Sequence, residues 1–119
     1  MIVAGFGFRG KATVDSLRDA LAQTGGRPQA LAAPGDKAAA ECLIQLAQSL
    51  FLPILAIDPG ALRAAATITQ SPVVRARRGT GSVAEAAALA GAGPGARLIG
   101  PRRISSDRLA TAALAKGGA

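Results

Sequence analysis

The sequence predicts an α/β protein: one three-layer domain over residues 1–119, with an about five-stranded, mostly parallel or mixed sheet flanked by helices. Three observations predict this class. The 119 residues are enough for one domain and too few for two ordinary ones. Short apolar runs alternate with helical segments along the chain. Half of the residues are apolar, mostly small aliphatic ones, so a core can form without disulfides or metals.

The first half of the chain contains three expected strands, over residues 2–5, 30–33 and 53–57. Thr13 is the expected N-cap of a helix whose apolar positions recur at three and four residues, and Gly25 ends this helix. Asp36 is the expected N-cap of a longer helix that continues to about Leu50. This alternation favours a largely parallel sheet.

The second half continues the alternation with a short helix over residues 61–66 and a turn-rich, arginine-rich segment over 70–81. Ser82 is the expected N-cap of a helix over 83–90, which a glycine-rich turn ends. A fourth strand is expected over 97–100. The last segment, residues 109–115, fits a strand or a helix on its pattern, and its alanine content favours a helix.

The composition excludes several kinds of chemistry. The chain has no histidine and one cysteine, so neither a His/Cys zinc site nor a Ser-His-Asp or Cys-His nucleophile can be assembled. We expect no metal and no cofactor, and Cys42 to be a small buried hydrophobe. The N-terminus reaches Arg9 too early for a signal peptide, and the most apolar run, residues 42–57, is too short and interrupted to span a membrane. We therefore expect a cytoplasmic protein that does not contact a membrane.

The positive charge is confined to one half of the chain. Residues 1–59 carry five basic and five acidic residues, whereas residues 60–119 carry nine basic residues against Glu85 and Asp107, which gives the net charge of +7. Such a field attracts a polyanion: a nucleic acid, an anionic membrane, or a polycarboxylate or phosphate ligand. The alternative is a generally basic surface with no specific ligand.

Residues 5–10 fit the dinucleotide-binding pattern G-x-G-x-x-G between a strand and a helix. The acidic residue expected about twenty positions later is missing, because residues 24–35 contain none. A dinucleotide site is therefore disfavoured. We retain the hypothesis of an anion-binding turn, at which Gly5 and Gly7 present backbone amides beside Arg9 and Lys11.

A second group of candidate residues surrounds the start of the helix at Ser82. Three arginines precede it at residues 75–78 and can hold carboxylates or phosphates in pairs of hydrogen bonds, although a solvated basic loop explains each of them equally well. Residues 79–81 directly precede the expected helix and can present their backbone amides to the same anion as the arginines. Glu85 either complements the positive helix end or lies partly buried against an arginine, and residues 101–103 add a basic cluster after a strand.

Five blocks, taken in order, resemble the CobE and CbiG C-terminal family of cobalamin (corrin ring) biosynthesis. They are the glycine-rich opening at residues 5–10, the strand that ends in Lys37-Ala38, the block 79–89 (GTGSVAEAAAL), the strand and basic residue at 97–102, and the threonine-containing block 109–115. Together they cover nearly the whole chain. The resemblance implies that residues 109–115 form a strand rather than a helix. The chain departs from the family pattern at Phe8, where the family often has cysteine, and at Ala39-Ala40, where acidic residues are common.

The resemblance implies a ligand that agrees with the charge. Intermediates of corrin synthesis are flat macrocycles fringed with acetate and propionate groups, and a basic rim around small residues suits them. The predicted ligand-binding residues are Gly5, Gly7, Arg9, Lys11, Lys37, Arg78, Gly79, Thr80, Gly81, Ser82, Glu85 and Arg102. Because both segments are glycine turns that lead into helices, we expect residues 5–9 and 79–82 to share one edge of the sheet.

Three functions remain open. The first is a non-catalytic protein that binds a tetrapyrrole-derived polycarboxylate or hands it to another enzyme of the corrin pathway. The second is an enzyme that acts on a precorrin lactone, as the related cobalt-precorrin-5A hydrolase does, with Lys37 and Glu85 as acid–base candidates. The third, nucleic-acid binding, is disfavoured because three phenylalanines are the only aromatic residues available for stacking on bases.

Overall fold

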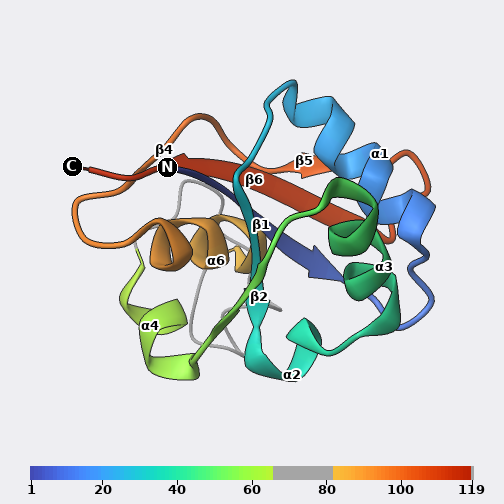
Figure 1. The fold of residues 1–119 in the computed structure, drawn as a ribbon, viewed down its shortest axis with the longest axis horizontal. Helices are drawn as coiled ribbons and strands as arrows, with labels where there is room; N and C mark the ends of the chain where they lie inside the picture. The colour runs from blue at the N-terminus through green and yellow to red at the C-terminus, as the bar shows by residue number, and fades with distance from the viewer. Residues whose placement is uncertain (66–81, 119) are drawn as a thin grey trace.

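The computed structural model describes residues 1–65 and 82–118, and within them a six-stranded mixed sheet lies between two layers of helices (Figure 1). The strand order is β3-β2-β1-β6-β4, and β5 pairs with β6 as well. The strands are β1 (Ile2–Phe8), β2 (Ala30–Pro34), β3 (Ile54–Ile57), β4 (Arg97–Leu98), β5 (Arg103–Ile104) and β6 (Ala110–Lys116). The predicted fold class is therefore confirmed, including the strand that the family resemblance implied at the end of the chain.

The parallel and antiparallel parts of the sheet meet at β1. On one side of it, β1, β2 and β3 pair in parallel, as the alternation of strands and helices predicts. On the other side, β6 pairs antiparallel with β1 over its whole length, from Ile2↔Lys116 to Phe8↔Ala110. The fourth strand is shorter than expected, and β5 was not expected. Each of these ladders is two residues long, too short for an alternating pattern to reveal.

The helices begin near the predicted caps, with one exception. In α1 (Val14–Thr24), Thr13 and Ser16 form a reciprocal capping box, and Gly25 ends the helix with φ 72°. The prediction of one helix from Asp36 to Leu50 was wrong. The chain forms α2 (Gly35–Ala38), an extended residue at Ala40, and then α3 (Glu41–Leu50). Alanine itself favours a helix, so the break follows from tertiary packing: α2 contacts β2 and β3, whereas α3 packs on α1.

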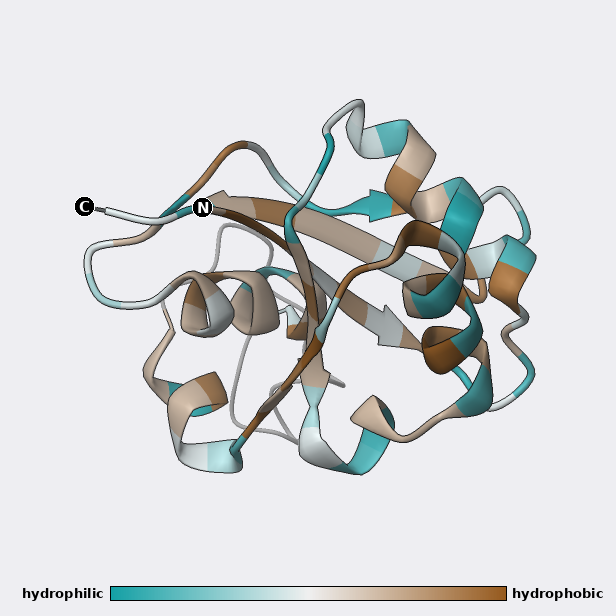
Figure 2. Cartoon of the chain, in the orientation of Figure 1, coloured by the Kyte–Doolittle hydropathy of each residue, from teal (hydrophilic) through white to brown (hydrophobic). Residues whose placement is uncertain are grey.

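Each face of the sheet is covered by its own pair of helices (Figure 1). Helices α1 and α3 cover the face that carries Ala4, Phe6 and Leu31, and α4 (Pro59–Ala64) and α6 (Val83–Ala92) cover the face of Val3 and Ala32. Figure 2 shows mainly apolar strands through the middle of the molecule, with polar residues on the outer turns of α1 and α2. In the two described ranges, no helix has the length and hydropathy needed to cross a membrane.

Helix α6 packs unusually close to β1, and Gly5 makes this possible. A Cβ atom added to Gly5 would lie 2.1 Å from the carbonyl oxygen of Ala84 and 2.4 Å from the backbone nitrogen of Ala88. At the other end of the helix, a Cβ on Gly91 would lie 3.0 Å from Val3 Cγ1. The first turn of α6 is therefore fixed over the carboxyl end of β1, because the helix runs antiparallel to this strand.

Candidate functional site

Several predicted site residues lie at one edge of the sheet, which we call the carboxyl edge. The parallel strands β1, β2 and β3 end there, and the antiparallel elements α6 and β6 begin there. The carboxyl edge comprises Phe8–Lys11, Gly35–Lys37, Asp58, Ser82–Glu85, Arg102 and Leu109–Thr111. Open α/β sheets usually bind ligands at this kind of edge, because loops and helix starts gather there.

The first two glycines of the G-x-G-x-x-G pattern lie inside β1 rather than in a phosphate-binding turn. Gly5 contacts the backbone of α6, and a Cβ on Gly7 would lie 2.9 Å from Thr111 Oγ1 and 3.4 Å from Val83 Cβ. Gly10, in contrast, has open space around it. The glycine spacing therefore serves helix–sheet packing in this fold, and it brings Gly7 beside the first turn of α6.

The basic residues that follow β1 are exposed at the carboxyl edge. The backbone N–H of Arg9 donates to the carbonyl oxygen of Leu109 at 2.9 Å, which ties the end of β1 to the turn before β6. The carbonyl oxygen of Arg9 accepts the N–H of Ala12 at 3.0 Å, so the chain turns sharply before α1. The side chains of Arg9 and Lys11 are left open to solvent, where a ligand can reach them.

Lys37 lies at the same edge because α2 follows β2 directly. Its Nζ atom is 5.3 Å from the centroid of the Phe8 ring, within the range of a cation–π interaction. Both side chains are half-buried. Sequence reasoning assigned no role to Phe8, because a contact between two residues that lie in different strand–helix units leaves no pattern in the sequence.

Ser82, Glu85 and Arg102 form a connected group at the start of α6. Ser82 Oγ accepts the N–H of Glu85 at 3.3 Å and caps the helix as predicted. Glu85 is fully buried, and its Oε2 atom accepts the backbone N–H of Arg102 at 2.8 Å. Hydrogen bonds of this kind, together with the positive helix end, offset the cost of burying a carboxylate. The sequence suggested that Glu85 lies partly buried against an arginine, and one group that contacts its carboxylate is the main-chain N–H of Arg102.

Thr111 is a further residue of the carboxyl edge that sequence reasoning did not single out. Its Oγ1 atom donates to the carbonyl oxygen of Gly7 at 3.2 Å and so links β6 to the end of β1. The available signal was its place in the last of the five family blocks. Arg78, Gly79, Thr80 and Gly81 lie outside the described residues, so their contribution to this edge remains a prediction.

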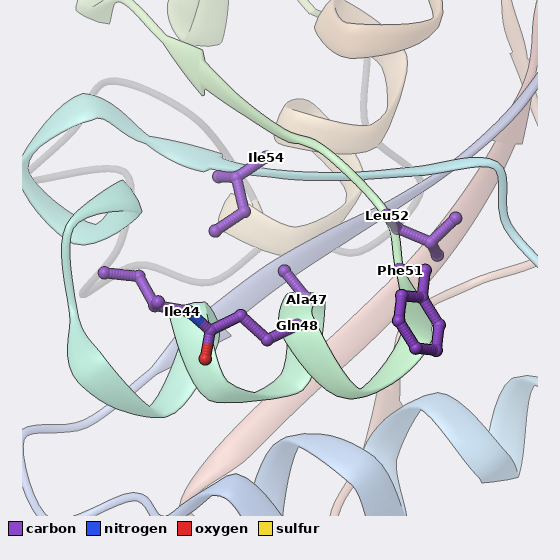
Figure 3. A pocket seen from close by; sticks show the side chains of 6 residues that line it. All are labelled: Ile44, Ala47, Gln48, Phe51, Leu52 and Ile54. Carbon is purple, nitrogen blue, oxygen red and sulfur yellow. The ribbon is translucent and has the colours of Figure 1, made fainter.

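Two surface hollows in the described part of the chain lie away from the carboxyl edge. The first is apolar, lies beside the edge strand β3, and is drawn in Figure 3; its lining residues are Ile44, Ala47, Gln48, Phe51, Leu52 and Ile54. The second lies between α4, the end of α6 and β4. Neither contains a predicted site residue. Across residues 1–65 and 82–118, no cluster of three or more His, Cys, Asp or Glu side chains could hold a metal ion.

Comparison with known proteins gives a consistent result. The family model described as "Cobalamin synthesis G C-terminus" matches residues 2–115. CobE, a protein from the cobalamin (vitamin B12) biosynthetic pathway, is 37% identical with a TM-score of 0.85, over 97% of this chain and 89% of CobE. Cobalamin biosynthesis protein chiG from Agrobacterium tumefaciens str. C58 is 34% identical with a TM-score of 0.76, over 100% of both chains. None of the curated proteins matches the chain.

Proposed function

Because the chain belongs to the cobalamin synthesis G C-terminus family, we propose that it binds a polycarboxylate precorrin or corrinoid intermediate at the carboxyl edge and hands it over unchanged. Membership of this family agrees with the resemblance of the five sequence blocks. To family membership the proposal adds which ligand is bound, where on the fold it binds, and that the protein does not transform it. An enzyme of the corrin pathway is the partner that would supply or receive the ligand.

The observation that carries the proposal is the set of cations at the carboxyl edge. Arg9 and Lys11 are exposed, Lys37 is half-buried, and the main chain of Arg102 is tied to Glu85. Gly7, Val83 and Thr111 lie together at the same edge and are half-buried. A corrin intermediate has an apolar ring and a fringe of carboxylates, and so it can pair with such cations while its ring covers apolar surface.

The geometry gives less support to catalysis by Glu85. An acid or base must reach the proton that it transfers, whereas this carboxylate is fully buried and holds the main chain of Arg102. Glu85 fits a role in shaping the carboxyl edge better than a role in acid–base chemistry. A binding protein is accordingly our proposal, and turnover of a precorrin lactone is an outcome that the experiment below can detect.

The test is a visible-spectrum titration of the purified protein with two corrinoids. Cobyrinic acid has side chains that end in carboxylates, and cobinamide has side chains that end in amides. We expect cobyrinic acid to bind with an affinity that falls as salt rises, because exposed charges are screened beyond roughly 8–10 Å, and cobinamide to bind far more weakly. Equal affinity for the two corrinoids would contradict a carboxylate site, and a new product in the presence of a precorrin lactone would indicate an enzyme.

Substitution of Arg9 locates the site. Arg9→Ala should weaken binding of cobyrinic acid by about 1–3 kcal/mol, or roughly 5- to 150-fold, if the guanidinium pairs with a carboxylate. Arg97→Ala is the matched control, because Arg97 is exposed and lies far from the carboxyl edge. In the sheet register its Cα atom is opposite that of Lys116, at the other end of β6. Arg108 is unsuitable as a control, since its neighbour Leu109 bonds to the backbone of Arg9. Equal losses for Arg9 and Arg97 would indicate a generally basic surface.

A further inference from the structure

The contact between Phe8 and Lys37 joins two strand–helix units at the carboxyl edge. Residues 4, 6 and 8 of β1 face helices α1 and α3, and the first two of them, Ala4 and Phe6, are fully buried. Phe8 packs against the same core and is half-buried, so its ring extends the core to the surface. The Lys37 ammonium lies 5.3 Å from the centre of this ring.

A ring anchored in this way can hold a lysine in one place. A free lysine side chain has four rotatable bonds and loses much rotamer freedom when a ligand immobilises it. The negative face of an aromatic ring attracts an ammonium group and reduces this freedom before the ligand arrives. The ammonium group has three N–H donors, and among the described residues Lys37 forms no ion pair. Donors on the side away from the ring can therefore reach a ligand carboxylate.

We propose that Phe8 is a positioning residue, which holds the Lys37 ammonium at the carboxyl edge in the place where it pairs with a carboxylate of the ligand. The inference rests on the proposed function and adds to it how one of the ligand-binding cations, Lys37, is held in place. Phe8 does not need to touch the ligand. Its contribution depends on the aromatic ring, whereas a purely structural role would depend on apolar volume alone.

The ligand-free arm of the test measures the ring current at Lys37. The sequence contains three lysines, Lys11, Lys37 and Lys116. Lysine labelled with ¹³C at Cε therefore gives three ε-methylene signals, and the signal that is missing in Lys37→Met belongs to Lys37. We expect the Lys37 ε-methylene protons to resonate upfield of those of the other two lysines. Phe8→Leu should remove this shift and Phe8→Tyr should retain it.

The binding arm uses cobyrinic acid as the probe. Phe8→Leu should weaken binding by roughly three- to tenfold, the effect expected of one cation–π contact, while Phe8→Tyr should stay within about twofold of the parent. If Phe8 acts through Lys37, the double variant Phe8→Leu/Lys37→Met should bind no more weakly than Lys37→Met alone. Phe51→Leu is the control, because Phe51 is 93% exposed and lies outside the carboxyl edge. Phe8→Met replaces Phe8→Leu if the latter does not fold.

The outcomes separate this inference from the proposed function. Binding of cobyrinic acid with unchanged affinity in Phe8→Leu, or with additive losses in the double variant, overturns the role of Phe8 and leaves the proposed function standing. An unshifted Lys37 resonance in the parent protein overturns the role of Phe8 as well. Absence of binding by the parent protein at low salt overturns the proposed function, and the role of Phe8 with it.

Discussion

The carboxylate of Glu85, fully buried on α6, accepts the backbone N–H of Arg102 at 2.8 Å and joins the helix start to the segment that leads into β5. The two residues are separated by 17 positions in the sequence, and the bond fixes the loop that carries the basic cluster of residues 101–103. Glu85 thus acts on the shape of the carboxyl edge from inside the protein.

Removal of this carboxylate should destabilise the protein. Glu85→Ala leaves the part-buried N–H of Arg102 without this acceptor and opens a cavity, and we expect a loss of about 2–4 kcal/mol in the free energy of unfolding. Glu85→Gln keeps a carbonyl oxygen in the same position and should cost less, about 1 kcal/mol. Urea denaturation measures both, with the exposed Glu41→Gln as the control. A loss for Glu85→Gln as large as that for Glu85→Ala would show that the negative charge, and not the acceptor, matters.

The glycines of the opening motif give a second prediction. Gly5→Ala would place a Cβ 2.1 Å from the carbonyl oxygen of Ala84, and a backbone atom cannot move aside cheaply, so we expect a loss of about 3 kcal/mol or more. Gly10→Ala, with no atom within 4 Å of the new Cβ, should change stability by no more than about 0.5 kcal/mol. Thermal unfolding of the two variants compares them directly. A comparable loss at Gly10 would mean that this position, too, is packed.

The outcome at these glycines shows which parts of the fold can be predicted from the sequence. Helix caps are local, and Thr13, Gly25 and Ser82 were identified because a cap needs a particular residue type at a particular position. The family resemblance supplied the strand at residues 110–116, for which the local pattern favoured a helix. The G-x-G spacing was read as a turn, since sequence alone does not show whether a glycine makes room for a ligand or for a helix.

The candidate site was predictable in its position but not in its contacts. Parallel strands bring their carboxyl ends to one edge, so the placement of Gly7, Lys37 and Ser82 follows from the order of elements. The pairing of Phe8 with Lys37 and the bond from Arg102 to Glu85 depend on packing distances of a few ångströms between remote segments. No periodicity or motif encodes them.

We expect the protein to lose stability in acid, because two aspartates connect the turn between β5 and β6 to α1. The backbone N–H of Ser106, above all, and its side chain lower the pKa of Asp19, while the hydroxyls of Ser105 and then Ser16 lower that of Asp107. Both carboxylates bind protons less readily in the folded protein than in the unfolded chain. Their contribution is therefore complete above the ordinary pKa of 3.8 and is lost as the pH falls from there through the folded-state values.

Urea denaturation at about pH 7, pH 5 and pH 3 measures this contribution. We expect little change between the first two values and a clear loss at the third. Asp107→Asn should be less stable than the parent at neutral pH and should lose less on acidification. Asp15→Asn is the control, because this carboxylate forms an exposed ion pair with Arg18 at 3.0 Å and does not contact the turn. An acid loss that is unchanged in Asp107→Asn would assign the effect to other carboxylates.

Substitution of Phe51 by glycine should stabilise the protein. It follows α3 with φ 57° and ψ 42°, a left-handed conformation that costs an L-residue roughly 1–2 kcal/mol and a glycine almost nothing. Its ring lies at the rim of the apolar hollow in Figure 3 and is 93% exposed, so it contributes little packing. Phe51→Gly should therefore raise the free energy of unfolding by about 0.5–1 kcal/mol, since the greater entropy of an unfolded glycine offsets part of the gain.

Phe51→Ala separates the backbone effect from the effect of the ring, because it removes the ring and keeps the Cβ atom. The stability of Phe51→Ala should stay close to that of the parent, so that only Phe51→Gly raises the free energy of unfolding. Thermal unfolding over a range of protein concentrations measures both variants. If both lower the midpoint, and if this loss grows with concentration, the ring is packed against a second copy of the chain and is not free in solution. A loss that is independent of concentration would instead show that the ring makes its contacts within one molecule, along the wall of Ile44, Leu52 and Ile54.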